Sequence, residues 1–251
     1  MQVGLDTLLL MTVDIEAMLG LLLLFAWVQN TSIHAVAWWG FAYLLRACSI
    51  VLFGMYGTVS ELITIDLANA ILFISFALTW AGARVFGGRS VQPLALVAGA
   101  ALWLLASRAS FLIDSQSVRV LLGSGIITAY TWLAAYEFWR GRNDQLISRW
   151  PTILVLAAYG AQVLLHTPLS AILPWTTDNY LISSAWLTTI SFGTLLFTIA
   201  VAFLFLAIAK ERNESRQKII TARLWRWPSI RAARDPCHAV EDEVVPAAKR
   251  C

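Results

Sequence analysis

The sequence predicts an all-α protein that spans a membrane seven times, and three observations support this fold class. First, 59% of the 251 residues are hydrophobic, and the mean hydropathy is +0.71. Second, only 13% are charged, against about 25% in soluble domains. Third, the apolar residues form long runs of the length that a helix needs to cross about 30 Å of hydrocarbon. The composition also excludes a disordered chain, and three cysteines are too few for a disulfide scaffold.

Seven apolar segments follow one another along the chain, and each is predicted to form one spanning helix. The fourth is the weakest because it is short, whereas the seventh is the longest and runs directly into Lys210, Glu211 and Arg212. We therefore expect the seventh helix to continue into the cytoplasm. The segments are about Thr7–Val28, Ile33–Phe53, Val59–Ala81, Pro93–Ser107, Val118–Phe138, Pro151–Leu169 and Ala185–Ala209.

The basic residues predict how these helices are oriented, because Lys and Arg concentrate in the cytoplasmic loops of membrane proteins. Arg84 and Arg89 flank the loop after the third segment, Arg140 and Arg142 follow the fifth, and the tail after the seventh is the most basic region. With seven helices, these regions share one side of the membrane. No Lys or Arg precedes Arg46, so the first segment lacks the basic start of a signal peptide. The predicted orientation has the N-terminus outside and the C-terminus inside.

Charge and composition divide the chain into three predicted regions. Residues 1–209, with 8 Lys/Arg and 9 Asp/Glu, form the seven-helix transmembrane domain. Residues 210–220 are predicted to form a cytoplasmic linker helix, in which Glu214 and Lys218 have the favourable i,i+4 spacing. Residues 221–251 contain three prolines and no sustained periodicity, which predicts an unstructured basic tail.

Three ionisable residues inside the predicted helices form the candidate site. Asp14, Arg46 and Asp66 each lie about seven residues from the outer end of their helix, or roughly 10 Å below the outer surface. A charge at membrane depth costs at least about 2.5–3.5 kcal/mol, so such residues usually find partners. We therefore expect a buried cluster of Asp14, Arg46 and Asp66. Glu16 lies near the same level but is expected to face elsewhere, because it is two residues from Asp14 on the helix.

The cluster has two interpretations. It is either a polar site reached from outside, for an anion, a proton or a small metabolite, or an ion-paired group that only fixes helix packing. The substitution Arg46→Gln separates them, because a structural role predicts poor insertion or degradation. A ligand-binding role instead predicts normal abundance with a lost response.

Other residues that often carry chemistry are scattered. His34 and His166 lie near opposite ends of their helices, so they cannot share a metal ion, and Cys48 is alone in its helix. The sequence contains no CxxC, HExxH, Walker or GxGxxG motif. We therefore predict no catalytic residue, metal or other cofactor and no nucleic-acid partner. The partner that the composition predicts is the lipid bilayer.

Four stretches resemble the membrane sensor region of bacterial GGDEF-domain diguanylate cyclases. They are Leu22–Gly40 (LLLFAWVQNTSIHAVAWWG), Asp66–Ala70 (DLANA), Trp80–Arg84 (WAGAR) and Ala207–Ile220 (AIAKERNESRQKII). The last of these looks like the linker that leaves the final membrane helix in that family. The resemblance covers about residues 5–220 and involves no catalytic motif.

The resemblance implies a sensory input module in a bacterial inner membrane, with a cytoplasmic C-terminus. In that family the module responds to a signal, here an unknown small molecule, and sets the geometry of a homodimer through the last helix and linker. The linker then leads into a domain with D-x-L-T-G-x-x-N-R-R and GG(D/E)EF motifs, which condenses GTP into cyclic di-GMP. This sequence has neither motif, and Glu241-Asp242-Glu243 lacks the paired glycines. The change of composition at Thr221 fits a frameshift or premature stop before the catalytic domain.

A small stand-alone membrane receptor or transporter is the alternative function. The intramembrane Asp/Arg cluster supports it, because ionisable residues at this depth often mark substrate or ion pathways. The odd number of predicted helices and the lack of segments with matching Gly/Pro interruptions speak against a transporter built from repeats.

Resequencing the gene from codon 200 onward, and reading all three frames for several hundred bases, tests the family resemblance. We expect another frame to encode D-x-L-T-G-x-x-N-R-R followed by GG(D/E)EF. If no frame encodes these motifs, the tail is genuine, and the stand-alone receptor or transporter becomes the leading interpretation.

Overall fold

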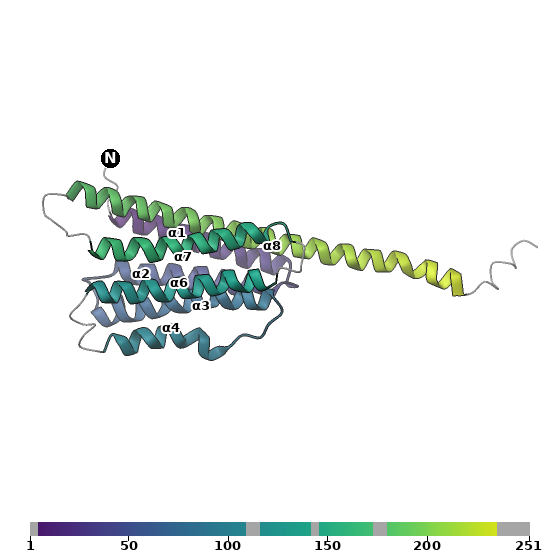
Figure 1. The fold of residues 1–251 in the computed structure, drawn as a ribbon, viewed down its shortest axis with the longest axis horizontal. Coiled ribbons are helices and arrows are strands. Elements are labelled where there is room, and N and C mark those ends of the chain that lie inside the picture. The colour runs from purple at the N-terminus through teal and green to yellow at the C-terminus, as the bar shows by residue number, and fades with distance from the viewer. Residues whose placement is uncertain (1–4, 109–115, 142–145, 173–179, 235–251) are drawn as a thin grey trace, which may run out of the picture. The chain divides into compact units, whose positions relative to one another are not determined.

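The computed structural model describes residues 5–108, 116–141, 146–172 and 180–234, and the part of the chain in these ranges is helical, with no strand (Figure 1). The all-α prediction is therefore confirmed. The elements are α1 (Leu5–Gln29), α2 (His34–Gly54), η1 (Leu62–Leu67), α3 (Ala68–Phe86), α4 (Pro93–Ala106), α6 (Gln116–Arg140), α7 (Arg149–Ile172) and α8 (Tyr180–Arg234). Consecutive helices run antiparallel, as Figure 1 shows for α1 to α7.

Five of these helices are long and apolar enough to cross a membrane: Leu9–Gln29, His34–Gly54, Leu62–Phe86, Val118–Arg140 and Phe192–Lys218. The helices Pro93–Ala106 and Arg149–Leu165 are apolar but shorter. Each of the seven predicted segments thus coincides with a helix, and five meet the length that a bilayer requires. This composition is that of a membrane protein.

Local sequence explains where several helices begin and end. The Asn30 Oδ1 atom accepts hydrogen bonds from the backbone N–H of Ser32 (3.2 Å) and from its hydroxyl (2.6 Å), which stabilises the turn between α1 and α2. Gly88 has a φ of +73°, a conformation that favours glycine, and it is the second residue after the end of α3. Pro93 is the first residue of α4, where its missing N–H costs no helical hydrogen bond.

Contacts along the chain divide it into two compact units, residues 1–209 and residues 210–251. The helix α8 continues to Arg234, whereas irregular chain was predicted from Thr221 onward. The prediction placed the end of the helix too early, because it relied on the prolines. Residues 221–227 contain Ala, Leu and Arg, which favour helix, and the Thr221 hydroxyl donates to Gln217 O within the helix (3.0 Å). Residues 235–251 of the predicted tail lie outside the described residues.

Aromatic rings from four helices fill the core of the first unit. Trp39 of α2 is fully buried and stacks on Phe205 of α8, with 4.1 Å between ring centroids. Phe86 of α3 and Phe138 of α6 lie within 6.1 Å of the same indole. The indole N–H also donates to the carbonyl oxygen of Thr79 (3.2 Å), so this buried donor is satisfied.

Glycines allow these helices to approach closely, as is common in membrane helix bundles. Gly20 of α1 faces Gly40 of α2, and a Cβ built on either would lie 3.1 Å from the carbonyl oxygen of the other. Gly82 of α3 lies against the Trp39 indole, where a Cβ would come within 2.4 Å of Nε1.

We expect Gly82→Ala to destabilise the protein by about 1–3 kcal/mol, because the added methyl group overlaps a fully buried indole. Unfolding of the purified protein in mixed micelles with increasing SDS measures this change. Gly125→Ala in α6 is the matched control, because no atom lies within 4 Å of its added Cβ. Equal effects of the two substitutions would show that the Gly82–Trp39 contact is not as close as described.

Candidate functional site

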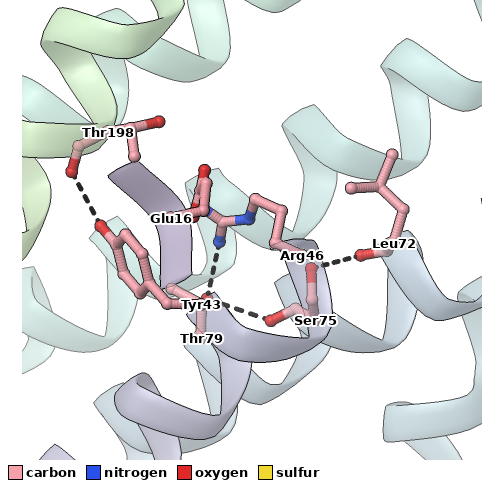
Figure 2. A network of polar contacts seen from close by, with 7 residues as sticks. All are labelled: Glu16, Tyr43, Arg46, Leu72, Ser75, Thr79 and Thr198. Carbon is pink, nitrogen blue, oxygen red and sulfur yellow. Dashed lines mark hydrogen bonds and ion pairs between the residues drawn. The ribbon is translucent and has the colours of Figure 1, made fainter. Parts of the chain in front are cut away.

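A buried polar network centred on Arg46 lies where α1, α2, α3 and α8 meet (Figure 2). We call it the Arg46 network, and its polar members are Glu16, Tyr43, Arg46, Ser75, Thr79 and Thr198. All six are buried.

The two guanidinium NH groups of Arg46 reach two different helices. Nη1 lies 3.4 Å from Oε1 of Glu16 on α1, which forms an ion pair, and Nη2 lies 3.4 Å from the hydroxyl oxygen of Thr79 on α3. The Thr79 hydroxyl donates in turn to Ser75 O (3.1 Å), and the Ser75 hydroxyl donates to Leu72 O (2.6 Å). One cation on α2 therefore holds α1 and α3 together.

Aromatic rings cover the rest of the guanidinium group. Its central carbon lies 4.4 Å from the ring centroid of Phe76 and 4.8 Å from that of Tyr43. Such contacts stabilise a desolvated cation by about 2 kcal/mol. The Tyr43 hydroxyl donates to the carbonyl oxygen of Thr198 on α8 (2.8 Å), as Figure 2 shows. Tyr43 therefore connects the cation with the last helix.

Two atoms of the ion pair are buried without a hydrogen-bond partner in the described part of the chain: Glu16 Oε2 and Arg46 Nε. A buried polar atom that lacks a partner costs about 1–3 kcal/mol. The ion pair thus carries unused hydrogen-bonding capacity, and small changes of geometry at this point have a large energetic effect.

The structure brings only one of the three predicted cluster residues, Arg46, into this network. Asp14 is exposed on α1, and among the described residues no ion pair joins Arg46 to Asp14 or Asp66. The partner is Glu16, which was predicted to face elsewhere. The prediction of the partner was wrong because the face of α1 that meets Arg46 was not identified. Two residues along a helix turn by about 200°, so Asp14 and Glu16 point to opposite sides.

Asp66 belongs to a different pair. Its Oδ2 atom lies 3.7 Å from Nη2 of Arg108, whose side chain is 65% exposed. Asp66 lies in η1, a wide helical turn that precedes α3, and Arg108 follows α4. This exposed pair contributes little to stability.

A second charged cluster, which the sequence did not predict, lies at the opposite end of α3. The buried carboxylate of Glu137 on α6 forms ion pairs with Arg84 (3.0 Å) and with Arg89. The Arg84 guanidinium also covers the Trp80 ring at 5.2 Å. Desolvation, and then the nearby Arg140 and Arg84, lower the pKa of Arg89. The predicted topological role of Arg84 and Arg89 is compatible with this pairing, but only the fold brings Glu137 to them.

The remaining candidates lie apart. His34 is exposed at the start of α2, and Cys48 is exposed on the same helix. His166 is part of α7, but its side chain lies outside the described residues. Within the described ranges, no three His, Cys, Asp or Glu side chains are placed to hold a metal ion.

Comparisons of the chain with protein-family models, with curated proteins and with solved structures find no match.

The Arg46 network can do two things chemically. It fixes the packing of α1, α2 and α3, because removing one member of a buried ion pair leaves an uncompensated charge. It also links this packing to α8 through one hydrogen bond, from the Tyr43 hydroxyl to Thr198 O. Nothing in this arrangement resembles a nucleophile or a general base held next to a reacting group.

We expect Arg46→Gln to destabilise the purified protein by about 3–5 kcal/mol, because Glu16 is left buried without its cation. The double variant Glu16→Gln/Arg46→Gln should recover part of this loss, since neither charge is then buried. SDS unfolding of Arg46→Gln, Glu16→Gln and the double variant measures the coupling free energy.

Asp14→Asn is the matched control, because Asp14 lies on the same helix but is exposed. It should change the free energy of unfolding by less than about 0.5 kcal/mol. If Asp14→Asn is as destabilising as Arg46→Gln, the assignment of Glu16 as the partner is wrong.

Proposed function

We propose that the chain is a sensory input module embedded in a bacterial inner membrane, of the kind that precedes GGDEF domains in diguanylate cyclases. In this proposal seven helices span the membrane, the N-terminus is outside and the C-terminus is in the cytoplasm. The module binds a small-molecule signal and transmits it through its last helix.

The observation that carries the proposal is the position of α8. Thr198 of this helix accepts the hydrogen bond from Tyr43 in the Arg46 network. The same helix continues without interruption from Tyr180 to Arg234, through the charged stretch that begins at Lys210. A helix that takes part in a buried polar network and continues beyond the apolar region is suited to carry a change of tilt or rotation to another domain.

The charge distribution supports the proposed orientation. Arg84, Arg89, Arg140 and Arg149 all lie at or near the end of a helix that points to the proposed cytoplasmic side. Lys and Arg in short loops determine the orientation of a membrane protein. The proposed cytoplasmic side carries most of the Lys and Arg found in residues 1–209. The shorter helices α4 and α7 complete the proposed count of seven. Each follows and precedes a helix that is long enough to span the membrane and that runs in the opposite direction to it.

We propose a homodimer through the end of α8 and the following charged helix. Lys210 and Glu214 form an i,i+4 pair on this helix (3.9 Å), and both are largely exposed. Pairing of two copies of this segment would place two output domains side by side, which is what the condensation of two GTP molecules requires.

A stand-alone receptor or small transporter is the second candidate, and the buried Glu16–Arg46 pair with its unsatisfied atoms favours it. Ionisable residues in an apolar bundle often mark ion or substrate pathways. Solute uptake into vesicles that contain the purified protein distinguishes the two, because a sensor moves no solute.

A fusion of residues 1–220 to an active GGDEF domain tests the input function. We expect Tyr43→Phe to change cyclic di-GMP production by about two- to tenfold, because it removes one buried hydrogen bond between the network and α8. Mass spectrometry of cyclic di-GMP, normalised to the amount of membrane-inserted fusion, measures this output.

Tyr56→Phe is the matched control, because Tyr56 is 61% exposed and lies between α2 and η1. Its output should equal that of the unmodified fusion. An unchanged output of Tyr43→Phe at equal abundance would contradict the proposal that the network controls α8.

A further inference from the structure

The geometry points to a second site, a ligand pocket for a small amphipathic carboxylate. A half-open pocket of about 330 Å³ lies in the first unit between η1/α3, α4, α6 and α7. Its lining includes Asn69, Phe73, Trp103, Arg119, Gly123 and Ser124. The volume is in the range of small-molecule sites and about twice that of an engineered cavity that holds benzene. It therefore accommodates one aromatic ring with a short side chain.

The walls of this pocket are mostly apolar. Phe73 of α3 and Trp103 of α4 meet edge to face, with 5.5 Å between ring centroids. Gly123 of α6 leaves the space beside them open, since a Cβ built there would lie 3.6 Å from Phe73 Cζ and 3.9 Å from Trp103 Cζ3. An occupant with an apolar body would replace these missing contacts.

The pocket also carries a positive charge. No described residue forms an ion pair with Arg119, which lines the pocket near the start of α6. Asp66, an acidic residue of the lining element η1, pairs with Arg108 (3.7 Å). A carboxylate suits this cation, because it accepts hydrogen bonds from a guanidinium with charge assistance.

Two helices connect this pocket to the Arg46 network. Phe73 lines the pocket, and Phe76, one turn further along α3, covers Arg46. Val163 of α7 also lines the pocket, and Tyr159, one turn earlier, stacks on Phe76 (6.3 Å) and contacts Phe197 of α8 (6.0 Å). An occupant would contact Phe73 and Val163, each of which lies one turn from a side chain that joins Arg46 or α8. This link to signalling rests on the proposed function, whereas the binding itself does not.

Calorimetric titration of the full-length protein in lipid nanodiscs tests the pocket. The probe is 4-phenylbutyrate, and its comparison ligands are 4-phenylbutylamine and 4-phenylbutanol, which share the apolar body but carry a positive or no charge. Empty nanodiscs supply the blank for partition into lipid. We expect saturable binding of the carboxylate, at least tenfold weaker binding of the alcohol and none of the amine. Absence of saturable carboxylate binding, or equal binding of alcohol and carboxylate, would overturn the proposal.

Three variants place the binding in this pocket. Arg119→Gln should weaken 4-phenylbutyrate binding at least tenfold, which is the contribution of a charge-assisted hydrogen bond. Gly123→Val should abolish binding by filling the cavity, and circular dichroism shows whether this variant is folded. Arg108→Gln is the matched control, because it removes an exposed arginine near the same end of the helices. If Arg108→Gln and Arg119→Gln weaken binding equally, the effect is a general surface charge and the pocket assignment is wrong.

The same titration separates the pocket from the proposed function. Binding that is lost in Arg119→Gln, together with a GGDEF fusion whose output does not respond to 4-phenylbutyrate, would support the pocket and contradict its role in signalling. Failure of binding would overturn the pocket and leave the Tyr43→Phe test of the input function unaffected.

Discussion

The buried guanidinium group of Arg46 is the constraint on which the packing of the first unit depends. A cation in an apolar bundle has to be neutralised and hydrogen-bonded. Glu16 supplies the charge from α1, Thr79 supplies an acceptor from α3, and Phe76 and Tyr43 supply aromatic faces. The relative positions of α1, α2 and α3 follow from these requirements.

The connection to α8 is of a different kind. It includes a neutral hydrogen bond from Tyr43 and the aromatic packing of Trp39 against Phe205. The last helix is thus joined to this region by polar and aromatic contacts, and a shift of the network can reach α8 through them.

The sequence predicted the helices well and the charged contacts poorly, for a physical reason. Apolar runs define a helix through composition alone, so α1 and α2 were found within a few residues of their ends. A residue's depth follows from counting, but its face depends on the rotation of the helix, which neighbouring helices determine. This is why Arg46 was identified as buried while Glu16 was passed over for Asp14. Glu137 was missed because its partners are distant in sequence.

The most direct test of the central claim measures whether the ion pair controls α8. The three cysteines are first replaced by serine, and nitroxide labels are attached to cysteines introduced at Phe41 on α2 and Phe203 on α8, which are both exposed. Double electron–electron resonance then gives the distribution of distances between the two labels. Glu16→Gln removes the counter-charge of Arg46 and leaves both labelled positions unchanged. The account predicts a displaced or broadened distribution in this variant. A distribution identical to that of the unmodified chain would show that α8 is positioned independently of the Arg46 network.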